Sequence, residues 1–290
     1  MKDQYSAGDA RQLVTNVSVS KLGQWTRCQQ QFEFTYLEGL RRPPSAAIAL
    51  GNAFDRTATS AYLDRMFLGS LPGSEELDGT FASIFEEEAC QVEDWEDNDR
   101  GKMLDSGIEI TREWKARVAI HVDPLRCQEP IEVKVGEVDK KAQDECAALG
   151  IEPEFKIIGF ADLRGRTRTK DGGTKEFIAD HKVGKKAWGD ADIVKSLQAV
   201  AYTLGSGLPE FQLHVGRRMS KGIKFDVLAR QVHPAEHEAL IRRVQIARRQ
   251  MANAVRTGDF LPNREHQLCS QRWCGFWREC VAKHGGLVAE

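Results

Sequence analysis

Two stretches in the middle of the chain alternate between apolar and polar positions, as half-buried β-strands do. They run from Phe155 to Leu163 and from Glu176 to Lys182, and they contain β-branched and aromatic residues. The segment between them, Arg164 to Lys175, holds the pair Gly172-Gly173, which is typical of a turn. The pattern therefore predicts a β-hairpin.

Apolar residues recur at helical spacing in the first part of the chain. Ser18 or Ser20 can cap a helix that ends near Gly39. Its apolar stripe consists of Leu22, Trp25, Cys28 or Gln29, Phe32 and Tyr36. After Pro43-Pro44 breaks the chain, we expect a second helix from about Ser45 to Met66.

The region between this second helix and the hairpin is acidic and without a catalytic signature. Two further helices are expected near Thr80 to Trp95 and Leu104 to Val122, with solvated acidic faces. Residues Pro130 to Val138 alternate as an antiparallel strand does.

The segment after the hairpin supplies the remaining elements of an α/β domain. Asp192 to Leu204 has helical character, strands are expected at Phe211 to Arg217 and Phe225 to Val232, and a long helix is expected from Pro234 to Thr257. We therefore expect a flexible lead at 1–16, a helical region at 17–129, a core at 130–258 and a C-terminal segment at 259–290.

Composition limits the class of protein. The chain has 290 residues, 41% of them hydrophobic, and no long uninterrupted apolar run, so we expect a soluble protein without a membrane span. The polar N-terminus lacks the apolar part of a signal peptide, and the cysteines number seven. These features favour a reducing, cytoplasmic location.

The charge is unevenly distributed. The formal net charge is -2, but Glu75 to Asp105 is acidic and His214 to Arg256 is basic. A small net charge therefore conceals a possible binding face for an anionic partner. Within the last predicted helix, a basic face that phosphates could contact consists of Arg242, Arg243, Arg248 and Arg249.

Candidate chemistry lies on the two hairpin strands. The first strand presents Asp162, and the second ends in Asp180, His181 and Lys182. Two carboxylates on neighbouring strands can hold Mg²⁺ or Mn²⁺, which prefer oxygen ligands, and a nearby lysine can orient water or stabilise charge on a phosphate. The pattern indicates a metal-dependent hydrolase.

The order of these residues resembles the PD-(D/E)xK nuclease superfamily. The motifs are G-x-x-D at Gly159 and Asp162, D-x-K at Asp180 and Lys182, and Q-x-x-x-Y at Gln198 and Tyr202. Within that superfamily the chain looks most like the branch of the RecB and AddB nuclease domains and the CRISPR-associated iron-sulfur exonucleases. A lone D-x-K is weak evidence, because residues so spaced are usually a solvated strand end. The ordered set is much stronger.

The resemblance implies a restriction-endonuclease-like core, in which helices flank a central mixed sheet. It implies that Asp162 and Asp180 hold the metal, that the His181 carbonyl can contribute an oxygen, and that Lys182 positions or activates water. Gln198 and Tyr202, on one face of a helix, would help to hold the substrate or the lysine.

Two further acidic residues are candidates. The family pattern has a metal-binding histidine where this chain has Asp55, and an aspartate can ligate Mg²⁺ or Mn²⁺ as well. A solvated helix aspartate is the alternative. Glu132 could lie beside the metal, although an outward-facing glutamate on a half-buried strand is at least as common.

The C-terminal cysteines form a second candidate site. They are Cys269, Cys274 and Cys280, spaced C-x4-C-x5-C, and the resemblance pairs them with Cys28 around a 4Fe-4S cluster. Zn²⁺ is the alternative, but structural zinc sites favour C-x2-C pairs, which this tail lacks. The remaining cysteines, expected to be ordinary thiols, are Cys90, Cys127 and Cys146.

The interpretation is a metal-dependent DNA exonuclease, acting on single strands or duplex ends in recombination, repair or end processing. A catalytically degenerate DNA-binding protein or a structural subunit is the alternative. The chain has no G-x-x-x-x-G-K-[ST] loop, so any ATP-driven unwinding would come from a helicase partner. An oligomer is possible.

Overall fold

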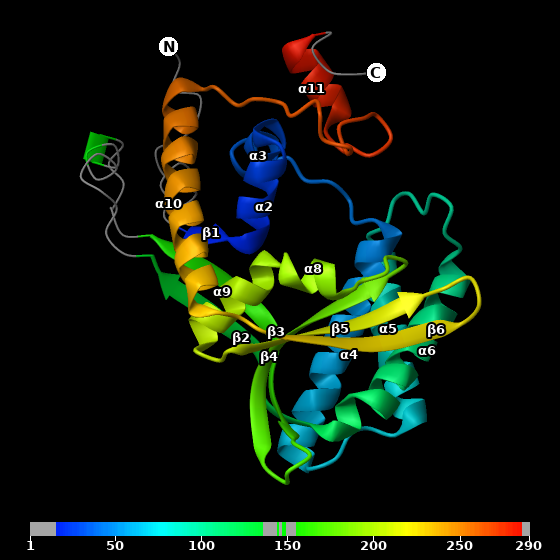
Figure 1. Cartoon of the computed structure of the whole chain (residues 1–290). Helices are drawn as coiled ribbons and strands as arrows, with labels where there is room; N and C mark the ends of the chain where they lie inside the picture. Colours follow the sequence, from blue (N-terminus) through cyan, green and yellow to red (C-terminus); the bar gives the residue numbers. More distant parts are fainter. Residues whose placement is uncertain (1–15, 136–143, 145–146, 149–154, 286–290) are drawn as a thin grey trace. The chain divides into compact units, whose positions relative to one another are not determined.

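The computed structural model describes residues 16–135, 144, 147–148 and 155–285 (Figure 1). The chain divides into two compact units. The first unit consists of Met1–Arg42, Glu132–Gly159 and Ala235–Glu290, and the second of Pro43–Ile131 and Phe160–Pro234. All but the last residue of the predicted flexible lead, and the end of the strand predicted at Pro130 to Val138, lie outside the described residues.

The predicted hairpin is confirmed, with longer strands than expected. Strand β3 is Lys156–Arg168 and β4 is Thr174–Gly184, and they pair antiparallel with Leu163 opposite Ala179. Strand β5 (Glu210–Arg218) lies parallel to β4, and β6 (Ile223–Gln231) lies antiparallel to β5. The sheet is therefore mixed, as predicted.

Two strands lie beside β3. Strand β1 (Asn16–Ser18) pairs parallel with the start of β3, and β2 (Val122–Lys134) also pairs with β3. Among the described residues the sheet has six strands: five follow the order β1-β3-β4-β5-β6, and β2 lies off this path as a second partner of β3. The helix expected to reach Val122 is thus wrong at its end, because the chain from Val122 is extended and pairs with β3.

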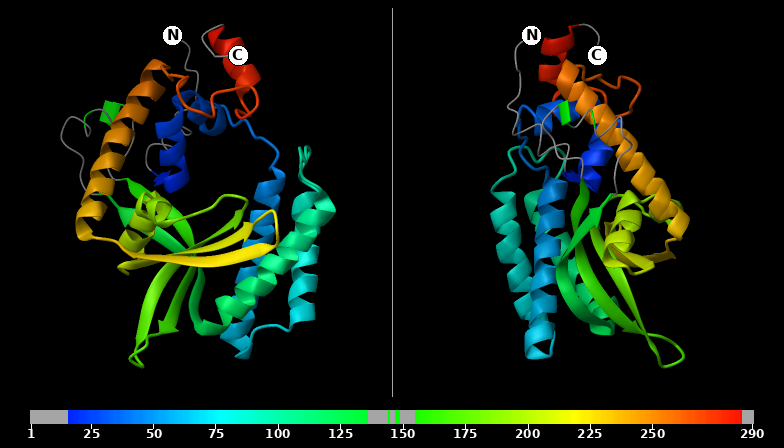
Figure 2. Two further views of the ribbon diagram at one scale, coloured as in Figure 1. Left: turned by 45° about the vertical axis from the view of Figure 1, so that its right-hand side comes forward. Right: turned by 90° about the vertical axis from the view of Figure 1, so that its left-hand side faces the viewer.

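Three helices of the second unit cover one face of its strands (Figure 2). They are α4 (Ala46–Leu68), α5 (Ser74–Ala89) and α6 (Arg100–Arg117), followed by the short η1 (Ala119–His121). Helix α4 begins at the Ser45 cap, as predicted. Helices α5 and α6 begin earlier than predicted, because Leu77 already faces the core and Asp99 caps α6.

Aromatic side chains fill the space between these helices and the sheet. Phe54, Trp114 and Phe177 are fully buried in one cluster. Gly107 permits the close packing of α6, since a Cβ there would meet the Phe81 ring at 2.1 Å. Burial of such side chains stabilises the fold by about 1.5–3 kcal/mol each, and it holds α4 at a fixed position against the strands.

The other face of the second unit's strands carries α8 (Asp190–Val194) and α9 (Leu197–Ser206) (Figure 2). The prediction of one helix over this stretch is wrong. The chain breaks because the Ser196 side chain accepts a hydrogen bond from the Ala199 N–H and thereby starts a new helix.

The first unit begins with two helices, where one was predicted. Helix α2 is Val19–Arg27 and α3 is Gln29–Tyr36, with Ser18 capping α2 as expected. Cys28 between them is extended, with φ of -162° and ψ of 112°. Cys28 is therefore no part of a continuous helical stripe, which corrects the predicted helix.

Helix α10 (Pro234–Thr257) has the predicted bounds, and α11 (Trp277–His284) lies near the end of the described chain. The predicted basic face of α10 is wrong at Arg248. Its side chain is 1% exposed, and the guanidinium lies 4.2 Å from the centre of the Phe155 ring. Arg242 and Arg243 are exposed.

Candidate metal site and thiol pocket

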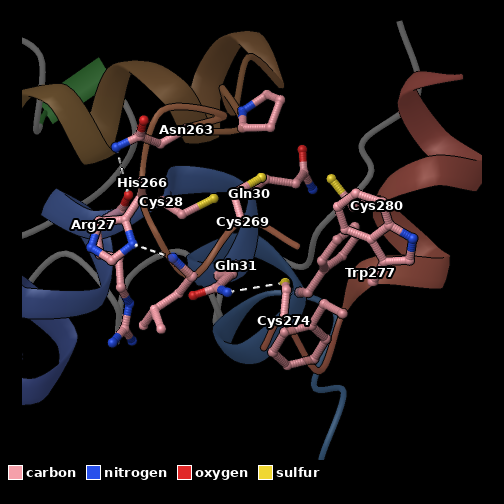
Figure 3. A pocket seen from close by; sticks show the side chains of 14 residues that line it. Arg27, Cys28, Gln30, Gln31, Asn263, His266, Cys269, Cys274, Trp277 and Cys280 are labelled. Carbon is pink, nitrogen blue, oxygen red and sulfur yellow. Dashed lines mark hydrogen bonds between the residues drawn. The ribbon is translucent and has the colours of Figure 1, made fainter. Parts of the chain in front are cut away.

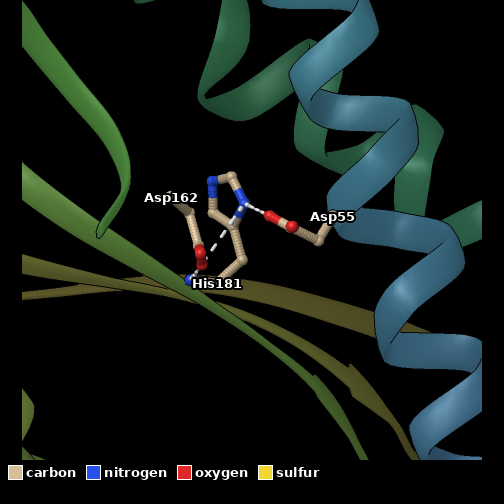
Figure 4. A group of neighbouring side chains, drawn as sticks. All are labelled: Asp55, Asp162 and His181. Atoms are coloured by element: carbon tan, nitrogen blue, oxygen red, sulfur yellow. Dashed lines mark hydrogen bonds and ion pairs between the residues drawn. The ribbon is translucent and has the colours of Figure 1, made fainter. Parts of the chain in front are cut away.

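The second unit brings three potential metal ligands together (Figure 4). They are Asp55 of α4, Asp162 of β3 and His181 of β4, and their ligand atoms lie within 4.8 Å of one another. Among the residues that the structure describes, this is the one group of three or more such side chains at that spacing. Asp55, the residue at the family's histidine position, therefore lies beside Asp162.

His181 connects the two carboxylates. Its Nδ1 lies 3.1 Å from Asp55 Oδ1, and its backbone N–H donates a hydrogen bond of 2.5 Å to Asp162 Oδ2. The imidazole is packed edge-on against Phe54 and stacked with His214 at 5.5 Å. Sequence reasoning assigned only the carbonyl of His181, whereas the structure turns its imidazole toward Asp55.

Burial raises the pKa of Asp162 to about 7, and the nearby charge of Asp180 acts in the same direction. Burial alone would lower the pKa of His181, but its hydrogen bond to Asp55 and the charge of Asp162 outweigh burial and raise it. Carboxylates this close repel one another. A divalent cation would offset that repulsion, so the donor set fits one.

Asp180 and Lys182 form an ion pair on β4. Because side chains alternate along a strand, both lie on the face opposite to the one that carries His181. Gln198 of α9 donates hydrogen bonds to Asp180 Oδ1, at 3.0 Å, and to the Tyr202 hydroxyl, at 3.2 Å. Burial, with the charge of Asp180, raises the pKa of Tyr202, which keeps its hydroxyl protonated. The structure thus joins the D-x-K and Q-x-x-x-Y motifs.

We call Asp55, Asp162, Asp180, His181 and Lys182 the acidic site. The sequence did not identify Gln128 as a neighbour of the acidic site. The Gln128 side chain donates a 3.1 Å hydrogen bond to Asp55 Oδ2, so Asp55 has a partner on each oxygen. Gln128 has a φ of 49°, which is uncommon for a residue other than glycine. A positive φ cannot be read from one sequence.

Glu132 has a structural partner of its own. Its carboxylate lies 2.6 Å from the Lys156 ammonium, and its side chain is 56% exposed. The arrangement is that of an outward-facing glutamate on β2, which was the alternative interpretation.

Four cysteines line one pocket of the first unit (Figure 3): Cys28, Cys269, Cys274 and Cys280. We call it the thiol pocket. Cys28 stands at the break between α2 and α3, and Cys280 lies in α11. The Gln31 amide donates to Cys274 Sγ at 3.1 Å. The break between α2 and α3, which the sequence did not predict, therefore places the Cys28 thiol in the pocket.

The C-terminal segment is tied to α2 and α3 around the pocket. Phe34 packs against Cys280, and its ring lies 5.7 Å from that of Phe276. The Asn263 side chain donates to the Arg27 carbonyl at 2.9 Å, and Lys283 pairs with the buried Glu33. Two ends of the chain thus meet around the thiols.

The thiols influence one another. Burial, followed by the charges of the other three cysteines, raises the pKa of Cys280 to about 11. Burial and the charges of Cys274 and Cys28 raise the pKa of Cys269. Such proximity is what a shared metal group requires, since a bound cation would stabilise the thiolates instead.

The remaining cysteines that the structure describes do not line the thiol pocket. Cys90 is exposed and Cys127 is half-buried. Cys146 lies outside the described residues. No helix in the described ranges is both long and apolar enough to cross a membrane.

The mixed sheet flanked by helices, with acidic residues on neighbouring strands, agrees with the restriction-endonuclease-like core that the sequence predicts. A family model of the PD-(D/E)XK nuclease superfamily matches residues 16–281. The chain belongs to this superfamily, and that prediction is confirmed.

Two solved structures are similar to the chain. The "Putative exonuclease" from Eubacterium rectale has 13% identity and a TM-score of 0.47, with 96% of each chain covered. The crystal structure of SSO0001 has 13% identity and a TM-score of 0.39, with 93% of this chain and 87% of that chain covered. A search of curated proteins finds no match.

Proposed function

We propose that the protein is a metal-dependent DNA exonuclease. The observation that carries this proposal is the convergence of Asp55, Asp162 and His181 beside the Asp180–Lys182 pair. A nuclease that had lost its activity would gain nothing from holding mutually repelling, partly or fully buried carboxylates next to an ammonium. Membership of a nuclease superfamily agrees with it.

The residues divide into ligands and groups that act on the substrate. Asp162 and Asp180 would hold Mg²⁺ or Mn²⁺, with Asp55 and the His181 carbonyl oxygen as further ligands. Such a cation lowers the pKa of water and neutralises phosphate charge. Lys182, fixed by Asp180, would position the attacking water for in-line displacement at phosphorus. Gln198 holds Asp180 in place through their hydrogen bond.

We further propose that the thiol pocket holds a 4Fe-4S cluster. Four thiolates are the ligand set of such a cluster, and the C-terminal segment lacks the C-x2-C pairs that structural zinc sites favour. Because Cys28 and the other three cysteines come from opposite ends of the chain, the cluster would serve as a crosslink. It would take no part in hydrolysis.

The branch that includes the RecB and AddB nuclease domains stays our prediction for this chain, as does a role in recombination, repair or end processing. A helicase partner would supply the unwinding that this chain lacks a nucleotide-binding loop to perform.

The test is cleavage of end-labelled single- and double-stranded DNA in the presence of Mg²⁺, Mn²⁺ or EDTA. We expect cleavage that requires the cation and releases label from ends. A covalently closed circle of the same sequence is the matched substrate, and its survival would distinguish an exonuclease from an endonuclease. Binding without cleavage under every metal condition would favour the degenerate alternative.

A further inference from the structure

The β3–β4 hairpin has an arm that extends past strands β5 and β6. Strand β5 pairs with β4 only from Ile178 onward, whereas β3 and β4 remain paired as far as Arg168 and Thr174 (Figure 1). The distal half of the hairpin therefore carries side chains that β5 and β6 do not cover.

A row of arginines runs along this arm from the acidic site. Residues at two-residue intervals share a face of a strand, so Arg164, Arg166 and Arg168 follow Asp162 on one face of β3. The intervening residues Leu163 and Gly165 are buried on the other face. The partners of the arginines on β4 show that this is also the face of Asp180 and Lys182, because Arg166 stands opposite Glu176.

The row ends in a cleft of about 830 Å³ in the second unit. Its lining includes Arg65 of α4, His121 of η1, Asp123 of β2, Arg166, Thr167 and Arg168 of β3, and Thr174 of β4. The lining thus contains three arginines and one acidic residue. The lining combines positive charge with neutral hydrogen-bond donors, which is the composition of a phosphate-binding surface.

The arginines differ in whether an acidic side chain neutralises their charge. Arg164 pairs with Glu176 and Arg166 pairs with Asp123. Arg65 donates to the Ala119 carbonyl, which is neutral, and Arg168 has no acidic partner among the residues described. Arg65 and Arg168 therefore retain charge that an anionic ligand can neutralise.

We propose that this cleft binds the sugar-phosphate backbone of DNA a few nucleotides from the bond that is cut. The proposal rests on the proposed nuclease function. Along an extended strand, Arg166 lies about 13 Å and Arg168 about 20 Å from Asp162. A stacked strand advances about 3.4 Å per nucleotide, so the cleft corresponds to a position about four to six nucleotides away, and fewer if the strand is extended.

The test measures DNA binding in EDTA, where no cleavage occurs. Single-stranded DNA labelled with a fluorophore is titrated at several salt concentrations with wild type, Arg168→Ala, and the double variant Arg65→Ala with Arg168→Ala. Removing one arginine that binds a phosphate should reduce the salt slope by about 0.7, so we expect a reduction of about 1.4 for the double variant. The matched control is Arg100→Ala with Arg112→Ala, which removes the same charge from α6.

A second measurement locates the bound phosphate. Neutral methylphosphonate linkages are placed singly along the DNA, and their effect on affinity is compared between wild type and the double variant. We expect wild type to lose affinity several-fold at one or two positions within about six nucleotides of the bound end, and the double variant to lose nothing there. Melting temperatures show whether Arg65→Ala damages the fold. If it does, the single variant Arg168→Ala, which breaks no ion pair, is used in place of the double variant.

Equal salt slopes for the double variant and the α6 control would overturn the proposal, as would methylphosphonate effects that persist in the double variant. These outcomes are independent of catalysis. DNA cleavage with no position-specific binding would leave the nuclease function standing and reject the cleft. Position-specific binding without cleavage would support the cleft and reject the nuclease.

Discussion

The acidic site of the second unit and the thiol pocket of the first differ in their donor atoms and in how the chain assembles them. The acidic site draws carboxylates and an imidazole from one helix and two adjacent strands, which are held by a common core. The thiol pocket draws sulfur from opposite ends of the chain. Hard oxygen donors suit a hydrolytic cation, and soft thiolates suit a cluster.

The acidic site is therefore expected to serve catalysis, and the thiol pocket to serve stability. The carboxylates repel one another, so removing one of them should cost activity and little else. The thiols join distant segments, so removing one of them should cost stability and leave the hydrolytic groups intact. Variants at the two sites should therefore give opposite results in assays of cleavage and of unfolding.

The largest effect is expected at the acidic site. Asp180→Ala or Asp162→Ala should reduce metal-dependent cleavage on the order of 10³-fold, the scale seen when one preorganised electrostatic group is lost. The melting temperature should change little, since the relief of repulsion offsets the contacts that are lost, which for Asp180 include the ion pair with Lys182. Asp105→Ala, at an exposed position of α6, is the control. Full activity of Asp180→Ala would reject the assignment.

Lys182→Arg tests whether the site requires a compact ammonium or merely a positive charge. The planar guanidinium keeps the charge but cannot occupy the same position beside Asp180, so the cleavage rate should fall at least about tenfold. Affinity for DNA, measured in EDTA, should not change. Equal cleavage rates for the two proteins would show that Lys182 acts only through its charge.

Cys28→Ser or Cys280→Ser should destabilise the protein while the folded fraction still cleaves DNA. If the cluster acts as a crosslink between Cys28 and Cys269, the chain-entropy relation for disulfides gives an upper value of about 5 kcal/mol. Iron content, colour and the unfolding midpoint of protein purified without oxygen measure the effect. Cys90→Ser is the matched control, because Cys90 is exposed. A colourless, iron-free wild type with the same stability as Cys28→Ser would contradict the cluster.

The smallest effect is a pH dependence of the metal-free protein. The pKa of Asp162 is raised to about 7 in the fold, above its value of about 3.9 in an unfolded chain. Its contribution to stability is therefore complete below about pH 4 and is lost as the pH rises toward about 7. The raised pKa of His181 acts in the same direction.

We expect the melting temperature of the metal-free protein to fall over this pH range, with a smaller fall for Asp162→Asn. Added Mn²⁺ should restore stability at the upper end of the range. Identical pH profiles for wild type and Asp162→Asn would show that Asp162 titrates normally.

Much of the secondary structure follows from local patterns in the sequence. The hairpin, strands β5 and β6, and helix α10 were all predicted, because period-two and helical repeats of apolar residues reflect one buried face. Two of the predicted helices were wrong because a single residue interrupts the helix, at Cys28 and at Ser196. Apolar periodicity continues across such a break, so the pattern does not reveal it.

The sequence by itself determined the superfamily, the order of the acidic motifs and the set of cysteines, because these depend on residue type and spacing along the chain. Only the tertiary structure decided that the His181 imidazole faces Asp55, that Arg248 is buried, and that the arginines of β3 lead into a cleft. The physical reason is that a side chain's direction and burial depend on which elements pack against its own. Those contacts join residues far apart in the chain, and a single sequence does not reveal which residues they join.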